Sequence, residues 1–188
     1  LQGVQVLAAR SLGEGNPSGA GVALQRGLVL AIAAGLASAL AMWAAGKNLF
    51  TVFGIEDALA APSTPVMAVL AISIPLHLIY IAGTYFLEAI KKPGISTAVM
   101  WLANGVNLAL NVWWVPEHGA VGSAWATVGA RVFLAGALLL CIFFLREGAR
   151  YGVRELGGKG PSYRALLAVG IAAAVSQAVE AGAFSAMT

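Results

Sequence analysis

The sequence predicts an all-α integral membrane protein, built as a polytopic helical bundle. Of its 188 residues, 60% are hydrophobic and only 10% are charged, whereas an ordinary soluble domain has about 25% charged residues. The mean hydropathy is +0.84, which excludes both a soluble globular protein and a disordered one. The hydrophobic residues gather in five long runs that are almost free of charge, namely 27–46, 58–87, 93–116, 119–145 and 165–188.

Each run is long enough to form a membrane helix, because crossing a bilayer takes about 20 residues at about 1.5 Å per residue. The first three runs contain no charged residue, the fourth is broken only by Arg131, and the fifth only by Glu180. We therefore expect five membrane helices. Residues 1–9 form a further apolar piece that is too short to span, and the last run reaches the final residue. We expect an internal piece of a longer membrane protein, with the remainder of the same polypeptide as its partner.

The sequence gives little indication of an enzyme or a metal-binding protein. The single cysteine, Cys141, lies inside an apolar run, which excludes an internal disulfide framework and a cysteine-rich metal site. The motifs H-E-x-x-H, C-x-x-C and G-x-S-x-G are absent from the sequence, so we do not expect an enzyme. The pI of 9.3 would suggest nucleic acid in a soluble chain. Here the positions of the charges matter more than their sum, and no nucleic-acid partner is expected.

Lysines and arginines lie mostly beside alternate loops, which predicts the orientation in the membrane, since cytoplasmic loops carry the excess of positive charge. The opposite side has Lys47 alone, beside Glu56, Asp57 and Glu117. The first, third and fifth loops are therefore expected to be cytoplasmic. Their basic residues are Arg10, Arg26, Lys91, Lys92, Arg146, Arg150, Arg154, Lys159 and Arg164.

Four of the predicted helices each carry a polar stripe at helical spacing. Ser, Thr and Asn side chains commonly join membrane helices by hydrogen bonds, so the stripes could be purely structural. The alternative, which we favour, is that the stripes line one shared, hydrated cavity, because they also contain His, Arg and Glu. The stripes are Ser73, His77, Tyr80 and Thr84; Thr97, Asn104, Asn107 and Asn111; Ser123, Thr127 and Arg131; and Ser176, Gln177 and Glu180.

Small residues recur every four positions on two helices, which predicts close helix packing there. These faces are Gly27, Ala31, Gly35 and Ala39, and Gly170, Ala174, Ala178 and Gly182. Pro75 removes a backbone hydrogen bond and should kink its helix, either at a moving gate or to fit a curved neighbour.

Charged residues within the predicted spans mark ion or substrate pathways by default. Glu180 lies deep in its span, where it could couple cation or proton binding to transport, or serve as a structural partner of Arg131. Arg131 lies near the midplane and could tune the cavity, form an ion pair or snorkel. His77 could relay protons or simply form a hydrogen bond. Glu88 is expected at the cytoplasmic interface, and His118 in water.

Several stretches in order along the chain resemble the multidrug and toxic compound extrusion (MATE) family. Residues 3–16 are similar to that family's pattern G-x-Q-x-L-x-A-x-x-L-G-x-G-[DN] at the end of the second helix and in the first cytoplasmic loop. Four further stretches follow at the family's spacing. These are Arg26-Gly27, Phe86-Leu87-Glu88 with Lys92-Pro93, the pair Asn107 and Asn111, and Gly119 to Thr127 with Gly122 and Ala126.

The resemblance implies the end of helix two through helix seven of a twelve-helix, two-lobed transporter in a bacterial plasma membrane. Residues 1–145 would belong to the first lobe, 146–164 to the cytoplasmic interlobe linker and 165–188 to the second lobe. Such proteins export organic cations or other amphiphiles in exchange for sodium or protons, and use no cofactor. Glu180 would couple the cation, and would be a metal ligand if the ion is sodium. Asn111 favours the NorM-type branch, because the DinF-type branch usually has Asp there.

The cavity-lining or substrate-binding residues are expected on the polar stripes: Asn104, Asn107, Asn111, His77, Tyr80, Thr84, Thr127, Arg131, Ser176 and Gln177. Two alternatives stay open. One is a lipid-linked sugar flippase of the same superfamily, which would call for a more cationic cavity than Arg131 alone provides. The other is a non-transporting membrane assembly subunit.

Overall fold

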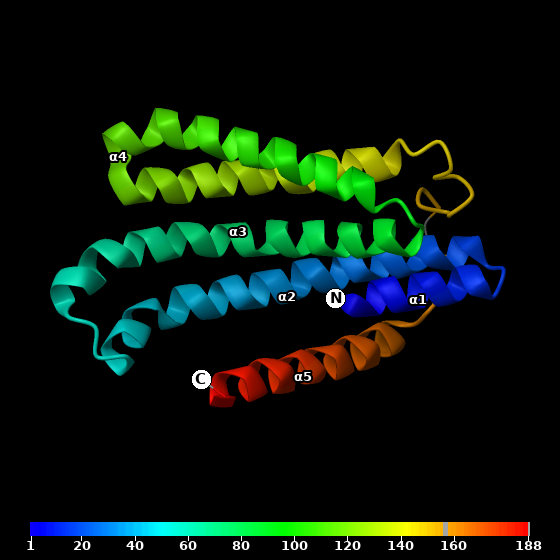
Figure 1. The fold of residues 1–188 in the computed structure, drawn as a ribbon, viewed down its shortest axis with the longest axis horizontal. Coiled ribbons are helices and arrows are strands. Elements are labelled where there is room, and N and C mark those ends of the chain that lie inside the picture. The colour runs from blue at the N-terminus through cyan, green and yellow to red at the C-terminus, as the bar shows by residue number, and fades with distance from the viewer. Residues whose placement is uncertain (156–157, 188) are drawn as a thin grey trace. The chain divides into compact units, whose positions relative to one another are not determined.

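The computed structural model describes residues 1–155 and 158–187, and all regular structure in them is helical (Figure 1). The predicted all-α class is confirmed. The helices in chain order are α1 (Gln2–Gly13), α2 (Pro17–Val52), α3 (Asp57–Ala89), α4 (Pro93–Phe143) and α5 (Tyr163–Met187). Three helices among the described residues are long and apolar enough to cross a membrane: α2, α3 and α4.

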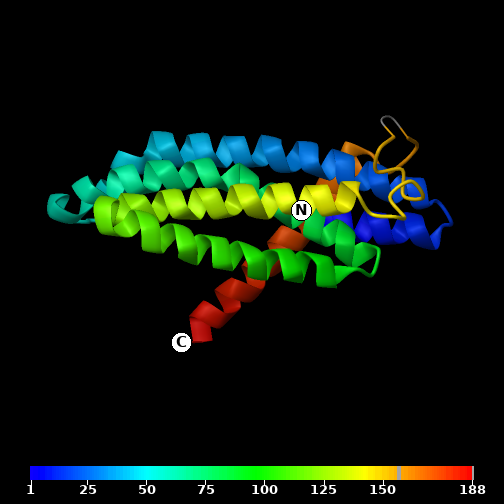
Figure 2. The same cartoon turned by 90° about the horizontal axis from the view of Figure 1, so that it is seen from above.

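The 51 residues of α4 turn back on themselves at Gly119, whose φ of 56° and ψ of −136° are not helical. Non-glycine residues are strained in that conformation. A straight helix of this length would measure about 76 Å, more than twice the hydrocarbon thickness. The two halves of α4 instead run side by side in both views (Figures 1 and 2). They correspond to the predicted helices 93–116 and 119–145, while α2, α3 and α5 correspond to the other three.

The ends of α2 differ from the sequence prediction. The uncharged run 27–46 marks only the part of the helix that hydrocarbon can cover, whereas α2 begins ten residues earlier and ends six residues later. A helix can continue into water on either side of a membrane, because its backbone hydrogen bonds are internal. The absence of charged residues therefore predicts which part of the helix lies in the membrane, but not where the helix begins and ends.

The chain folds into two compact units, each assembled from segments that are distant in the sequence. Unit 1 comprises Leu1–Leu30, Ala82–Pro93 and Ile142–Thr188, and unit 2 comprises Ala31–Ile81 and Gly94–Cys141. Nine of the eleven lysines and arginines belong to unit 1, which thus collects all three loops expected in the cytoplasm. The units cut through individual helices, so they do not correspond to the predicted division at residues 145 and 164, which stays a prediction.

In unit 1, α1 packs against α5. A Cβ added to Gly3 would lie 2.5 Å from the carbonyl oxygen of Leu166, so the two backbones approach closely. Gln5 Nε2 donates a hydrogen bond of 2.9 Å to Glu88 Oε2 at the end of α3. Two residues of the family-like motifs, far apart in the sequence, are therefore in direct contact.

The segment between α4 and α5 is fastened to the beginning of α2 by side chains. Gln25 Nε2 faces the carbonyl oxygens of Gly152, Val153 and Glu155 at 3.5, 3.2 and 2.8 Å. An amide nitrogen has two protons, so these bonds are shared. The neighbouring Arg26 completes the attachment further along the segment.

Arg26 Nη1 donates to the carbonyl oxygen of Pro161 at 2.6 Å, and its guanidinium lies 5.4 Å from the ring centroid of Tyr163. On the α4 side of the same segment, Lys92 Nζ lies 3.0 Å from Glu147 Oε1. The hydrogen bond and positive charge of Lys92 lower the pKa of the Glu147 carboxyl. The predicted linker is thus attached at several of its described residues.

In unit 2, the first small-residue face does what its spacing predicts. A Cβ added to Gly35 would lie 2.5 Å from Pro75 Cα, so α2 and α3 approach closely where Pro75 lies. This fit supports the interpretation that Pro75 accommodates a neighbouring helix. The second face is different, because no atom lies within 4 Å of a Cβ added to Gly170 or Gly182. Ala174 and Ala178 are also exposed, so no other described helix segment of unit 1 packs on that face.

We expect Gly35→Ala to lower the free energy of unfolding by about 1–3 kcal/mol, because the new methyl group overpacks the contact with Pro75. The thermal unfolding midpoint in detergent measures the effect. Gly105→Ala is the matched control, since no atom lies within 4 Å of its added Cβ. Equal midpoints for the two variants would contradict the close approach of α2 and α3.

We expect Gln25→Ala to loosen the segment between α4 and α5, because the carbonyl groups that faced Gln25 lose their donor. Limited proteolysis with trypsin, which cuts after Arg150 and Arg154, should be several-fold faster than in the unmodified protein. Gln2→Ala is the control, since Gln2 makes no side-chain hydrogen bond within the residues described. Unchanged cleavage would mean that Gln25 does not hold the segment.

Candidate functional site

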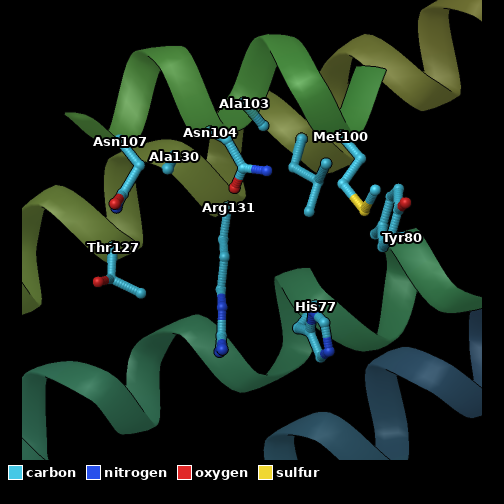
Figure 3. A pocket seen from close by; sticks show the side chains of 10 residues that line it. His77, Tyr80, Met100, Ala103, Asn104, Asn107, Thr127, Ala130 and Arg131 are labelled. Atoms are coloured by element: carbon cyan, nitrogen blue, oxygen red, sulfur yellow. The ribbon is translucent and has the colours of Figure 1, made fainter. Parts of the chain in front are cut away.

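A cavity of about 340 Å³ lies within unit 2, between α3 and the two halves of α4. It contains six of the residues that the polar stripes predicted, and Figure 3 shows how they project from the three helical segments. The stripes of these segments therefore do meet at a common hollow. The lining residues are His77, Tyr80, Met100, Ala103, Asn104, Asn107, Thr127, Ala130, Arg131 and Leu134.

Arg131 extends from the second half of α4 towards α3 (Figure 3). Its Nη1 donates a hydrogen bond of 2.6 Å to Ser73 Oγ, and the buried Ser73 donates in turn to the carbonyl oxygen of Leu70 at 2.6 Å. Within unit 2, no carboxylate whose side chain the structure describes pairs with Arg131. The alternative of an ion pair with Glu180 stays a prediction, because Glu180 belongs to unit 1. An arginine at a helix centre costs about 2.5–3.5 kcal/mol on insertion scales, so this cation needs solvation from the cavity.

His77 and Tyr80 form the α3 wall of the cavity. Their rings stack at a centroid distance of 6.3 Å with an interplanar angle of 27°. Tyr80 Oη donates to the carbonyl oxygen of Ser96 at 3.4 Å. His77 Nδ1 is buried and has no hydrogen-bond partner among the described residues. A ligand or water in the cavity would supply the missing partner.

The polar side chains of α4 differ in how many of their hydrogen-bonding groups have a partner. Thr127 Oγ1 donates to the carbonyl oxygen of Ser123 at 3.0 Å. Asn111 Nδ2 donates to the carbonyl oxygen and to Oδ1 of Asn107, at 2.8 and 3.1 Å. Asn104 makes no side-chain hydrogen bond in the part of the chain that the structure describes. Its amide group is therefore available to a molecule in the cavity.

The other predicted site residues lie elsewhere. Asn111 lines a separate, open hollow together with Gly119 and Ser123. Thr84 belongs to the end of α3 in unit 1, where its Oγ1 is buried without a partner among the described residues. The stripe of α5 also belongs to unit 1 and is exposed; its members are Ser176, Gln177 and Glu180.

The cavity also contains apolar side chains that the polar stripes did not indicate. Met100 and Ala103 precede Asn104 and Asn107, respectively, by four residues, so they share the same helical face. Ala130 and Leu134 follow Thr127 and Arg131, respectively, by three residues and lie on the same face for the same reason. Including the apolar positions three or four residues from each polar one would have found them. The wall is thus amphipathic, with polar and apolar groups beside one another.

Comparison with known proteins identifies the family. A family model described as MatE matches residues 1–113, more than half of the chain. The chain belongs to the MatE family. The resemblance that the motifs predicted is therefore confirmed, and the chain is that of a multi-pass membrane protein.

One relative within the MatE family is the probable multidrug resistance protein NorM of Caulobacter vibrioides. It is 37% identical over 194 aligned positions, which cover 100% of this chain and 41% of the relative. A solved structure of a multidrug resistance MATE family transporter of the MOP superfamily, in its inward-facing conformation, matches with a TM-score of 0.79. That match covers 90% of this chain and 39% of the other at 22% identity, and so shows the shared fold. The chain spans about two fifths of the length of these MatE relatives.

We expect water to reach the cavity. In a Cys141→Ser background, Asn107→Cys should react with a membrane-impermeant methanethiosulfonate reagent. Leu108→Cys is the neighbouring control, because Leu108 is 67% exposed and does not line the cavity. A thiol facing acyl chains stays protonated and unreactive, so its labelling should be at least about tenfold slower. Failure of Asn107→Cys to react would contradict a hydrated cavity.

Proposed function

We propose that the protein is a cation-coupled antiporter that exports organic cations or other amphiphiles by alternating access. The single observation that carries the proposal is the cavity of about 340 Å³ lined from three helical segments of a MatE-family chain. Its volume is within the usual range for small-molecule sites, about 300–1,000 Å³. Its wall combines polar groups with apolar ones such as Met100 and Leu134, which suits an amphiphilic molecule.

Similarity to the NorM protein of Caulobacter, which is described as a probable multidrug resistance protein, supports the same proposal. It also supports a location in a bacterial plasma membrane. The gathering of the basic loops in unit 1 supports a cytoplasmic position for that unit, because positive loops stay in the cytoplasm. We propose transport without a cofactor and without catalysis.

Glu180 is our proposed coupling residue. It is exposed on α5 and forms no hydrogen bond or ion pair with any other residue that the structure describes. A carboxylate in a predicted membrane span is costly unless a proton or cation neutralises it. Binding of sodium or a proton to one transport state would then shift the equilibrium between outward-facing and inward-facing states by its differential affinity for the two.

Glu180→Gln should abolish efflux of a fluorescent organic cation driven by a sodium or proton gradient, because glutamine cannot exchange a charge with the coupling ion. The measurement uses membrane vesicles from cells that express the protein from its complete gene. Glu155→Gln, which removes an exposed carboxylate of the segment between α4 and α5, is the control and should keep full efflux. Normal membrane expression with undiminished efflux would remove Glu180 from the coupling mechanism.

A further inference from the structure

Among the described residues that line it, the cavity in unit 2 has a cation and no anion. Among its lining residues, Arg131 is the one with a permanent charge, while Tyr80, Asn104, Asn107 and Thr127 are neutral. The six polar residues of the lining include neither Asp nor Glu. A cavity built to hold a simple organic cation would be expected to contain the opposite charge, because like charges repel in a medium of low dielectric constant.

The guanidinium of Arg131 has unused hydrogen-bonding capacity. It has five N–H donors, of which the structure engages one, on Nη1, with Ser73 Oγ at 2.6 Å. The hydroxyl of Ser73 is neutral, so no side chain that the structure describes compensates the positive charge. Buried guanidinium groups are usually paired, and their planar fork matches the geometry of a carboxylate.

Further donors lie around the same cavity. The amide of Asn104 makes no side-chain hydrogen bond with the described residues, and His77 Nδ1 is buried without a partner there. In its protonated state this nitrogen can donate. Figure 3 shows His77 and Arg131 at the α3 side of the cavity, with Asn104 and Asn107 on the first half of α4.

We propose that Arg131 is a specificity-determining residue that selects amphiphiles carrying a carboxylate, so that zwitterions bind better than cations without an acidic group. The carboxylate binds the free N–H groups of Arg131, and the apolar part of the ligand lies against Met100, Ala103 and Leu134. This inference rests on the proposed transport function, whose substrate class it narrows.

The test compares two dyes that differ only at the acidic group: rhodamine B, which has a free carboxylate, and its ethyl ester, which has none. The protein, expressed from its complete gene, is placed in nanodiscs, and fluorescence anisotropy gives the dissociation constant of each dye. The unmodified protein should bind rhodamine B about tenfold or more tightly than the ester, the ratio expected from a hydrogen bond between charged groups.

Arg131→Gln should remove this preference by weakening rhodamine B about tenfold or more while leaving the ester unchanged or tighter. Arg131→Lys keeps the charge but loses the planar fork, so it should retain part of the preference. Arg164→Gln removes an exposed cation at the start of α5 and should leave both dissociation constants unchanged.

Three results would overturn the proposal. Equal binding of the two dyes by the unmodified protein would show no selection, and failure to bind rhodamine B would exclude the carboxylate ligand. Equal weakening of both dyes in Arg131→Gln, together with a lower unfolding midpoint, would indicate that Arg131 pairs with a carboxylate of the protein itself. Efflux of the same dyes tests the proposed function separately. Preferential binding without gradient-driven efflux would refute the antiporter and leave the selectivity of Arg131 standing.

Discussion

Hydrocarbon offers no hydrogen-bond partner, so every polar group in a membrane-spanning helix must find one within the protein or in a hydrated cavity. Short side chains in unit 2 satisfy this constraint locally. Ser73 and Thr127 donate to carbonyl oxygens of their own helices, and Asn111 donates to Asn107. Longer side chains cannot do so. Arg131 reaches across to Ser73, and its remaining donors face the hollow with those of Asn104 and His77. The need to satisfy polar groups within the membrane therefore determines both how these helical segments pack and which side chains line the cavity.

The constraint on unit 1 is different, because its polar groups belong largely to loops that we propose to lie in water. The segment between α4 and α5 has little regular structure, so its carbonyl groups need donors from elsewhere. Gln25 and Arg26 supply them from the first part of α2, and Asn16 adds a bond of 3.4 Å to the carbonyl oxygen of Lys159. Packing of Gly3 against Leu166 holds the beginning of α5 on α1. A segment that looked like a simple connection in the sequence is thus an integral part of this unit.

Hydrophobic runs predicted the helices well, because a span must exclude charge over its whole length. Helical spacing also predicted which faces of α3 and α4 share a cavity. The sequence could not show that Gln25 contacts residues 152–155, since a backbone carbonyl has the same chemistry at every residue and leaves no pattern. It also could not place the α5 stripe. Spacing shows that Ser176, Gln177 and Glu180 share one face, but not which element that face meets. The hydrogen bond from Arg131 to Ser73 was not predicted either, because a neutral hydroxyl is a less obvious acceptor for a guanidinium than a carboxylate.

The two halves of α4 are joined at Gly119 without an intervening loop. Neither half therefore has a flexible connection that would let it stay outside the bilayer while the other half enters during synthesis. We therefore expect both halves to enter the lipid together as one hairpin. Asn104 and Asn107 then face Thr127 and Arg131 from the moment of entry, since both halves line the same hollow. The guanidinium thus avoids crossing acyl chains on an isolated helix. The sharp turn at Gly119 thus keeps the polar faces of both halves together, with Arg131 twelve residues beyond the turn.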